Sequence, residues 1–212
     1  MDYEKERQEL CRWCRNAYWR DLVYASDGNF SMRVGADRIL ITPSGRNKGF
    51  LAPEDLLLAR LDGTVLSGGT VSREFPMHRY IYTQRPEVAA VFHAHPVFAT
   101  ALASSALGLP DNYFVEVPLF LGQVPVAPFA APGTPEIVEA IRPHVDSTKN
   151  LLIKNHGVVV YDTSLEAAFN RLEILESACR TFAWTELLGR PSVISPEEMA
   201  RLRNSAKRRK NV

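Results

Sequence analysis

The chain has 212 residues, of which 46% are hydrophobic and 23% charged, and its formal net charge is +1. This balance is typical of a globular protein with one sizeable core. The net charge lacks the strong basic excess of most nucleic-acid-binding domains, which argues against that class of protein. No apolar run approaches the roughly 18–20 residues that span a bilayer, and the charged N-terminus lacks the layout of a secretory signal, so we expect a cytoplasmic protein without membrane or nucleic-acid partners.

Helical periodicity marks several segments of the chain. The predicted helices cover residues 3–24, 74–84, 96–106, 134–142 and 164–187, with a short helical turn at 53–56. Cys11 and Cys14 form a C-x-x-C within the first of them, which we interpret as two thiols on one helix face. We expect Thr134 to cap the fourth helix, with Pro135 in its first turn, and Ser164 to cap the last.

Extended segments rich in β-branched residues lie between these helices. The predicted strands cover residues 30–34, 38–42, 57–61, 65–66, 88–93, 113–117, 123–126, 151–154 and 158–161. Turn residues at Gly35-Ala36-Asp37 and Asp62-Gly63 indicate hairpins. Because helices and strands are mixed without a linker, we predict one α/β domain over residues 1–206, followed by a basic, mobile tail at 207–212. Nucleic-acid binding by this tail is a weaker alternative.

Three of the five histidines stand at strand ends or turns, as His93, His95 and His156. In an H-x-H on an extended segment both side chains point to the same side, because strand side chains alternate with a period of two. Two such imidazoles can chelate one ion, and His156 would complete a three-histidine face with an open position for water or substrate. From H-x-H alone, ordinary hydrogen-bonded histidines remain the alternative.

Glu74 opens the predicted helix at residues 74–84. A carboxylate beside a metal could act as a general base or as a fourth ligand. The alternative is that its charge only favours the first helical turn. His78 follows one helical turn later, where it would either orient Glu74 or pack in the core.

Two glycine-containing turns are candidate anion sites, namely Gly28-Asn29-Phe30-Ser31 and Thr42-Pro43-Ser44-Gly45. Backbone N–H groups in such turns, together with nearby hydroxyl groups, can bind a phosphate. The sequence contains neither a P-loop nor a G-x-G-x-x-G motif, so nothing in it supports a nicotinamide cofactor.

Five motifs, in this order, resemble the class II aldolase/adducin family. They are Gly28-Asn29-Phe30-Ser31, Thr42-Pro43-Ser44-Gly45, Ser72-x-Glu74-x-x-x-His78, His93-Ala94-His95 and Asn155-His156-Gly157. The resemblance extends from about residue 8 to about residue 188. It implies a single three-layer α/β/α domain with a mainly antiparallel central sheet, and a homotetramer with active sites at subunit interfaces.

The resemblance also implies the roles of individual residues. In catalytic members one zinc ion per subunit is held by the histidines that match His93, His95 and His156. The residue that matches Glu74 ligates the resting metal and then serves as the catalytic acid/base. Tyr113 lies near the position of a catalytic, proton-donating tyrosine.

A phosphate-binding set follows from the same resemblance. The positions that hold the substrate phosphate or its neighbouring oxygens match Gly28, Asn29, Ser44, Gly45 and Ser72. Arg73 stands where the family often has a second serine, and it would either add charge to this anion site or point away from it.

The family resemblance implies a zinc-dependent aldolase acting on a small ketose 1-phosphate of the deoxyketose or methylthio-pentulose type. Retro-aldol cleavage through a metal-stabilised enediolate would give dihydroxyacetone phosphate and an aldehyde. Glu74 favours this branch over pentulose-phosphate 4-epimerases, which usually have aspartate there. Sugar-phosphate dehydratases and decarboxylases remain open alternatives, and a non-catalytic adducin-like interaction module is a weaker one.

Overall fold

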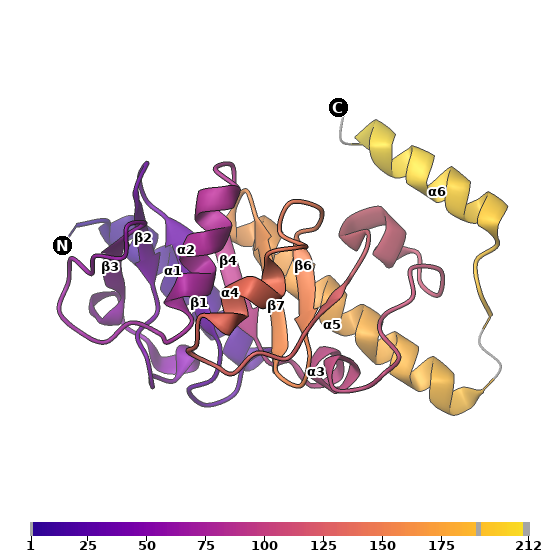
Figure 1. The fold of residues 1–212 in the computed structure, drawn as a ribbon, viewed down its shortest axis with the longest axis horizontal. Coiled ribbons are helices and arrows are strands. Elements are labelled where there is room, and N and C mark those ends of the chain that lie inside the picture. The colour runs from indigo at the N-terminus through magenta and orange to yellow at the C-terminus, as the bar shows by residue number, and fades with distance from the viewer. Residues whose placement is uncertain (1, 190–191, 210–212) are drawn as a thin grey trace.

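A seven-stranded sheet forms the centre of the protein, which a computed structural model describes over residues 2–189 and 192–209 (Figure 1). Its strands are β1 (Asn29–Arg33), β2 (Arg38–Ile41), β3 (Leu57–Arg60), β4 (Ala90–Ala94), β5 (Val126–Ala127), β6 (Asn150–Ile153) and β7 (Gly157–Asp162). Their order is β3-β2-β1-β4-β7-β6-β5, and every neighbouring pair is antiparallel except β5 and β6. The predicted α/β fold with a mainly antiparallel sheet is confirmed.

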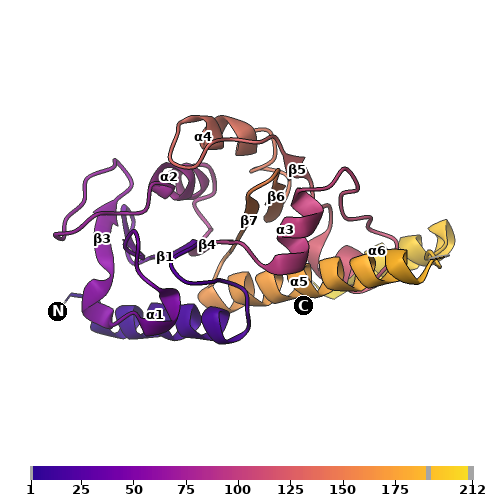
Figure 2. The same ribbon diagram turned by 90° about the horizontal axis from the view of Figure 1, so that it is seen from below.

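Helices lie on both faces of this sheet. They are α1 (Glu4–Trp19), α2 (Phe75–Gln84), α3 (Val97–Ala103), α4 (Glu136–Ile141), α5 (Leu165–Leu188) and α6 (Pro196–Arg209). Figure 2 shows α1 and α5 on one side of the strands and α2 and α4 on the other, which gives three layers. Among the described helices, none combines the length and the apolar character that crossing a bilayer requires.

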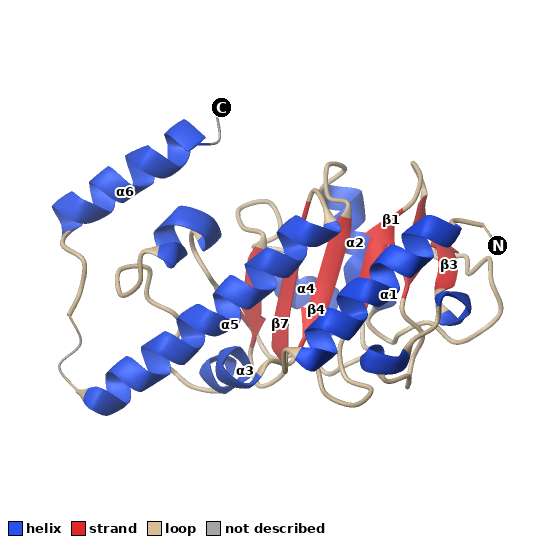
Figure 3. Cartoon of the chain, turned by 180° about the vertical axis from the view of Figure 1, so that it is seen from behind, coloured by secondary structure: helices blue, strands red, loops and turns tan. Residues whose placement is uncertain are grey.

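The alternation of strand side chains divides the buried residues into two hydrophobic cores. Phe92 of β4 packs toward α1, α3 and α5, whereas the adjacent Val91 packs toward α2 and α4. Strands β4 and β7 are buried along their whole length, since both of their faces are covered (Figure 3). Cys11 and Cys14 are buried together in the first core, as the helix-face interpretation predicts.

An ion-pair network closes the end of β7. Asp162 lies 2.6 Å from Lys149 Nζ and 2.9 Å from an Arg171 guanidinium nitrogen. Burial alone would raise the pKa of Asp162, but the hydrogen bonds from these two cations lower it below its usual value. Arg171 also donates to Asn150 Oδ1. The network therefore fastens α5 to β6 and β7, at strand ends distant from the His156 turn.

Most predicted helices and hairpins are present, with shifted ends. The first helix ends at Trp19 rather than at residue 24, because Asp21 and Ala25 take left-handed conformations that a helix cannot continue. Ser164 caps α5 by accepting from the backbone N–H of Ala167, as predicted. The second hairpin is present as a single β-bridge between Ala59 and Val65.

Three predictions in the second half of the chain are wrong. Residues 113–117 do not form a strand: residues 113–116 lead into a π-helical segment, Val117–Leu121, in which Pro118 has no N–H to give to a sheet. The strand predicted at 123–126 is reduced to β5. Thr134 does not cap α4, since its hydroxyl donates to the carbonyl of Ala131 instead and Pro135 is the cap residue.

The C-terminal region contains a helix that periodicity does not predict. Residues 207–209 of the basic tail belong to α6, while residues 210–212 lie outside the described part of the chain. The division between a domain at 1–206 and a mobile tail stays a prediction.

Candidate active site

The centre of the site forms where β1 begins and β4 ends. His93 lies within β4, directly opposite Asn29 of β1 and Val159 of β7, and His95 follows just beyond the last strand residue. The extended backbone directs both imidazoles to the same side, as the H-x-H spacing predicts. The strand register therefore brings Asn29 and the two histidines into one corner.

The third histidine comes from the turn between β6 and β7. Asn155 adopts a left-handed conformation with φ of 55°, which asparagine tolerates better than most residues, and it projects His156 toward β4. A Cβ on Gly157 would lie 2.4 Å from the His95 ring and 2.5 Å from the carbonyl oxygen of Ala94. The glycine is therefore required by the close packing of this turn against the histidine pair.

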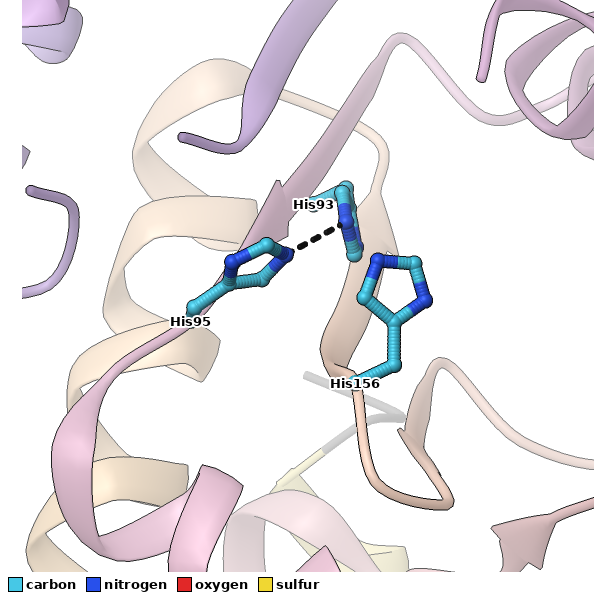
Figure 4. A group of neighbouring side chains, drawn as sticks. All are labelled: His93, His95 and His156. Atoms are coloured by element: carbon cyan, nitrogen blue, oxygen red, sulfur yellow. Dashed lines mark hydrogen bonds between the residues drawn. The ribbon is translucent and has the colours of Figure 1, made fainter. Parts of the chain in front are cut away.

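The three imidazoles converge on a common point (Figure 4). Their candidate ligand atoms all lie within 4.8 Å of one another, and the Nε2 atoms of His93 and His95 are 3.0 Å apart. The Glu74 carboxylate approaches His93 Nε2 and His156 Nε2 at 3.1 Å each. The separations of 3.0 and 3.1 Å are close to the roughly 3.3 Å expected between ligands of a tetrahedral ion with bonds of roughly 2.0–2.1 Å. The set fits a divalent metal.

The ring nitrogens that point away from the common point, the Nδ1 atoms, determine which atoms face the ion through the hydrogen bonds that they make. His93 Nδ1 donates to the carbonyl of Val158 at 2.8 Å, which leaves the lone pair of Nε2 to the metal. His95 Nδ1 lies 3.6 Å from a carboxylate oxygen of Asp27. Within the part of the chain that is described, His156 Nδ1 has no hydrogen-bond partner. A hydrogen bond within the same chain thus orients His93, while Asp27 lies near Nδ1 of His95 without a hydrogen bond to it.

Electrostatics keep the carboxylate ionised. Glu74 is only 7% exposed, and burial alone would raise its pKa, but the charge of His93 and hydrogen bonds from His156, His93 and Asn29 hold the pKa well below its usual range. Glu74 in turn raises the pKa of His93 against the effect of burial. Burial and the neighbouring His93 lower the pKa of His95 to about 3. An ionised Glu74 and a neutral His95 are the forms that ligate a cation.

A cavity of about 260 Å³ lies beside the histidines. It is lined by Ser26, Asp27, Gly28, Asn29, Pro43, Ser44, Gly45, Lys48, Ser72, Arg73, Glu74, His95, Pro132 and His156. All six residues predicted to bind the substrate phosphate are in this set. Their part in phosphate binding stays a prediction, but the fold does bring both glycine turns to one cavity.

The two turns use their glycines differently. Gly28 has φ of 64°, and a Cβ there would lie 2.6 Å from the carbonyl oxygen of His93. Gly45 has φ of 69° with open space around it. Gly28 is therefore needed for close approach of the backbone, whereas Gly45 is needed only for the shape of its turn.

Two charged residues that the sequence motifs do not predict as site residues line the cavity. Lys48 is 1% exposed and donates to the carbonyl oxygens of Ser26 and Arg46 at 2.8 and 2.9 Å, so that it ties one glycine turn to the other. Asp27 lies at the cavity wall beside His95. Their only signal in the sequence is closeness to the two glycine motifs.

Tyr113 lies apart from this cavity. Its hydroxyl donates to a Glu186 carboxylate oxygen at 3.4 Å, and its ring packs on Phe182 of α5. Tyr113 is not among the residues that line the cavity. A proton-donor role at this site would require the tyrosine of a second copy of the chain, and it stays a prediction.

A three-histidine metal site with a buried carboxylate, at one end of an antiparallel sheet covered by helices, defines a metal-dependent enzyme of three-layer α/β/α architecture. Residues 8–183 match the family described as Class II Aldolase and Adducin N-terminal domain. The chain therefore belongs to the class II aldolase and adducin family.

Relatives with different activities are found at similar identity. The chain is 34% identical over 184 residues to 3-oxo-tetronate 4-phosphate decarboxylase of Haemophilus influenzae, which covers 84% of this chain and 86% of that protein. It is 31% identical over 173 residues to L-fuculose phosphate aldolase of Methanococcus maripaludis, covering 81% of this chain and 93% of that one. A solved structure of L-fuculose 1-phosphate aldolase superposes with a TM-score of 0.88 at 28% identity, covering 98% of both chains.

Proposed function

We propose that the chain is a metal-dependent lyase that decarboxylates a 3-oxo sugar-acid phosphate. The observation that carries the proposal is the convergence of His93, His95, His156 and Glu74 beside a cavity lined by two candidate anion turns. The reaction type is supported by the decarboxylase at 34% identity. This choice differs from the aldolase to which the motifs alone lead, and retro-aldol cleavage of a ketose 1-phosphate becomes the second candidate, supported by the aldolase at 31% identity.

The two reactions share their chemistry. In a 3-oxo-tetronate 4-phosphate, breaking the C1–C2 bond releases carbon dioxide and leaves an electron pair on C2, which is delocalised onto the C3 carbonyl oxygen. Protonation of C2 then gives dihydroxyacetone phosphate. Retro-aldol cleavage of a ketose 1-phosphate leaves the same enediolate but releases an aldehyde. One site can therefore serve either reaction, and the leaving group distinguishes them.

A divalent ion held by the three histidines, with zinc as the first candidate at one per subunit, would supply Lewis acidity at the substrate carbonyl. Glu74 would move a proton at the reacting carbon. The Asn29 amide, which donates to Glu74 at 2.7 Å, orients that carboxylate. Ser44, Ser72 and Arg73, which line the same cavity, would bind the phosphate.

The test measures dihydroxyacetone phosphate and carbon dioxide separately. The purified protein is incubated with 3-oxo-tetronate 4-phosphate and with L-fuculose 1-phosphate, each with and without a chelator. Chelator-sensitive release of both products from the 3-oxo acid is the expected result. Dihydroxyacetone phosphate from the ketose phosphate alone would replace the decarboxylase by the aldolase. No product from either, with zinc bound, would contradict both and favour the epimerase or dehydratase branches.

Assembly and location are also part of the proposal. A homotetramer with shared active sites is supported by large apolar side chains on the surface of the single chain, among them Trp19, Phe50 and Phe129 at 68%, 67% and 60% exposure. Light scattering after size exclusion tests this, and a monomer at working concentration would contradict it. A cytoplasmic location stays a prediction.

A further inference from the structure

A continuous chain of hydrogen bonds runs through the protein from Tyr82 to the active-site carboxylate. The Glu74 carboxylate can only accept, so the Asn29 nitrogen Nδ2, 2.7 Å from Glu74 Oε2, is the donor. The other amide atom, Asn29 Oδ1, then lies 2.6 Å from His78 Nε2. Because an amide oxygen only accepts, His78 Nε2 must carry a hydrogen.

The direction of the remaining bonds follows. His78 is completely buried, which disfavours a charged ring, so Nδ1 is an acceptor when Nε2 carries the hydrogen. Ser31 Oγ, at 2.6 Å, donates to Nδ1. The Tyr82 hydroxyl, at 2.9 Å, then donates to Ser31 Oγ. Every donor in this series of hydrogen bonds points toward Glu74, and each of its groups has only one orientation that satisfies its neighbours.

The fold encloses this series of hydrogen bonds between one helix and one strand. Glu74, the N-cap residue of α2, is followed at intervals of four residues by His78 and Tyr82 within the helix, while Asn29 and Ser31 share one face of β1. Tyr82, Ser31, His78 and Asn29 are 1%, 0%, 0% and 3% exposed, so bulk water cannot replace any of these bonds. The four-residue spacing on the helix and the two-residue spacing on the strand therefore bring together the same side chains that the fold buries.

We propose that His78 is a positioning residue for Glu74, acting through the Asn29 amide. Without the His78 N–H, the Asn29 amide is free to turn over and present its oxygen to the carboxylate, which would repel Glu74. When the His78 N–H is present, the NH₂ group of Asn29 always faces Glu74 and holds the carboxylate against His93 and His156. The catalytic consequence rests on the proposed function, but the orientation of the ring and the amide does not.

The first experiment therefore uses the metal-free protein without substrate. Long-range ¹H–¹⁵N NMR correlations of the imidazole rings report which nitrogen is protonated, and the His78 signals are assigned by their loss in His78→Gln. We expect a neutral ring with the hydrogen on Nε2 at pH 7. A hydrogen on Nδ1, or on both nitrogens, would overturn the proposal whatever reaction the enzyme catalyses.

The second experiment separates positioning from structural support. We expect His78→Leu to lower kcat roughly 10–100-fold and to weaken zinc affinity roughly tenfold, as loss of an orienting contact behind a metal site does, with KM changed by no more than about twofold. His78→Gln, whose amide nitrogen can donate to Asn29, should recover most of both losses. His144→Leu, a histidine outside the site, is the matched control.

Two outcomes would refute the positioning role. One is wild-type kcat and zinc affinity in His78→Leu. The other is a His78→Gln variant that folds like the wild type but recovers neither quantity. If no tested substrate is turned over, the zinc affinities and the NMR result still decide the inference, so its failure and that of the proposed function are distinguishable. If His78→Leu does not fold, His78→Gln and the ring protonation remain measurable.

Discussion

Replacing Glu74 by glutamine removes one charge and leaves the shape of the side chain unchanged. The glutamine oxygen can still accept from Asn29 Nδ2, which donates to Glu74 at 2.7 Å in the wild type. The three histidine ligands are unchanged, and their convergence does not depend on Glu74, because each is placed by β4 or by the turn before β7. We therefore expect Glu74→Gln to fold normally and to retain metal.

Activity should fall much further than metal binding does. A positioned general acid or base contributes roughly 10²–10⁴-fold to a rate. At about 1.36 kcal/mol per factor of ten, this corresponds to about 2.7–5.4 kcal/mol of transition-state stabilisation. A glutamine amide cannot transfer a proton, so the whole of this contribution should be lost. Metal affinity should weaken less than activity does, because three nitrogen ligands remain.

The assay compares kcat with bound zinc per chain, measured by elemental analysis of the same preparation. Glu139→Gln is the matched control, because Glu139 lies on the surface, where it pairs with Arg142. Wild-type turnover in Glu74→Gln would refute the acid/base role. Loss of zinc in parallel with activity would show instead that Glu74 acts mainly as a ligand.

Three further predictions concern the site and its support. His93→Ala should lose metal and activity together while keeping its circular dichroism spectrum; full zinc occupancy would contradict the ligand assignment. Gly28→Ala should lower the free energy of unfolding in urea more than Gly45→Ala does. Both substitutions cost about 1–2 kcal/mol for the left-handed conformation, but only Gly28→Ala places a Cβ 2.6 Å from the His93 carbonyl oxygen. Equal losses would argue against that contact. Asp162→Asn should lower the free energy of unfolding by about 2–3 kcal/mol. This is less than the roughly 3–5 kcal/mol lost when a fully buried pair is broken, because one of the two cationic partners of Asp162 is 30% exposed. The corresponding fall in Tm is roughly 4–12 °C. Since the pKa of Asp162 is lowered in the folded state, this difference should be complete above the unfolded pKa of about 3.9 and should vanish as the pH falls through the folded pKa; a difference that persists at low pH would contradict it.

Local signals in the sequence determined much of this protein. The spacing of His93 and His95 on a strand end predicts a shared side, because side-chain alternation is a property of each strand alone. Ser164 predicts the start of α5, because an N-cap acts within three residues. The ordered motifs predict the family, its fold class and the three histidines. The first two depend on residues that are close together along the chain, whereas the family prediction needs five local motifs in their order along nearly the whole chain.

Only the tertiary structure decided how these parts meet. The pairing of β1 with β4 places Asn29 opposite His93, and the turn at Asn155 carries His156 to the same corner. The hydrogen bonds that orient His78 join residues from a helix and a strand that no local pattern relates. Residues 113–117 have strand-like composition but lie beside α5, because Pro118 and side-chain packing on Phe182 exclude them from the sheet. Contacts between distant segments are set by the packing of whole elements, and therefore the sequence alone identifies the chemical groups but not their arrangement.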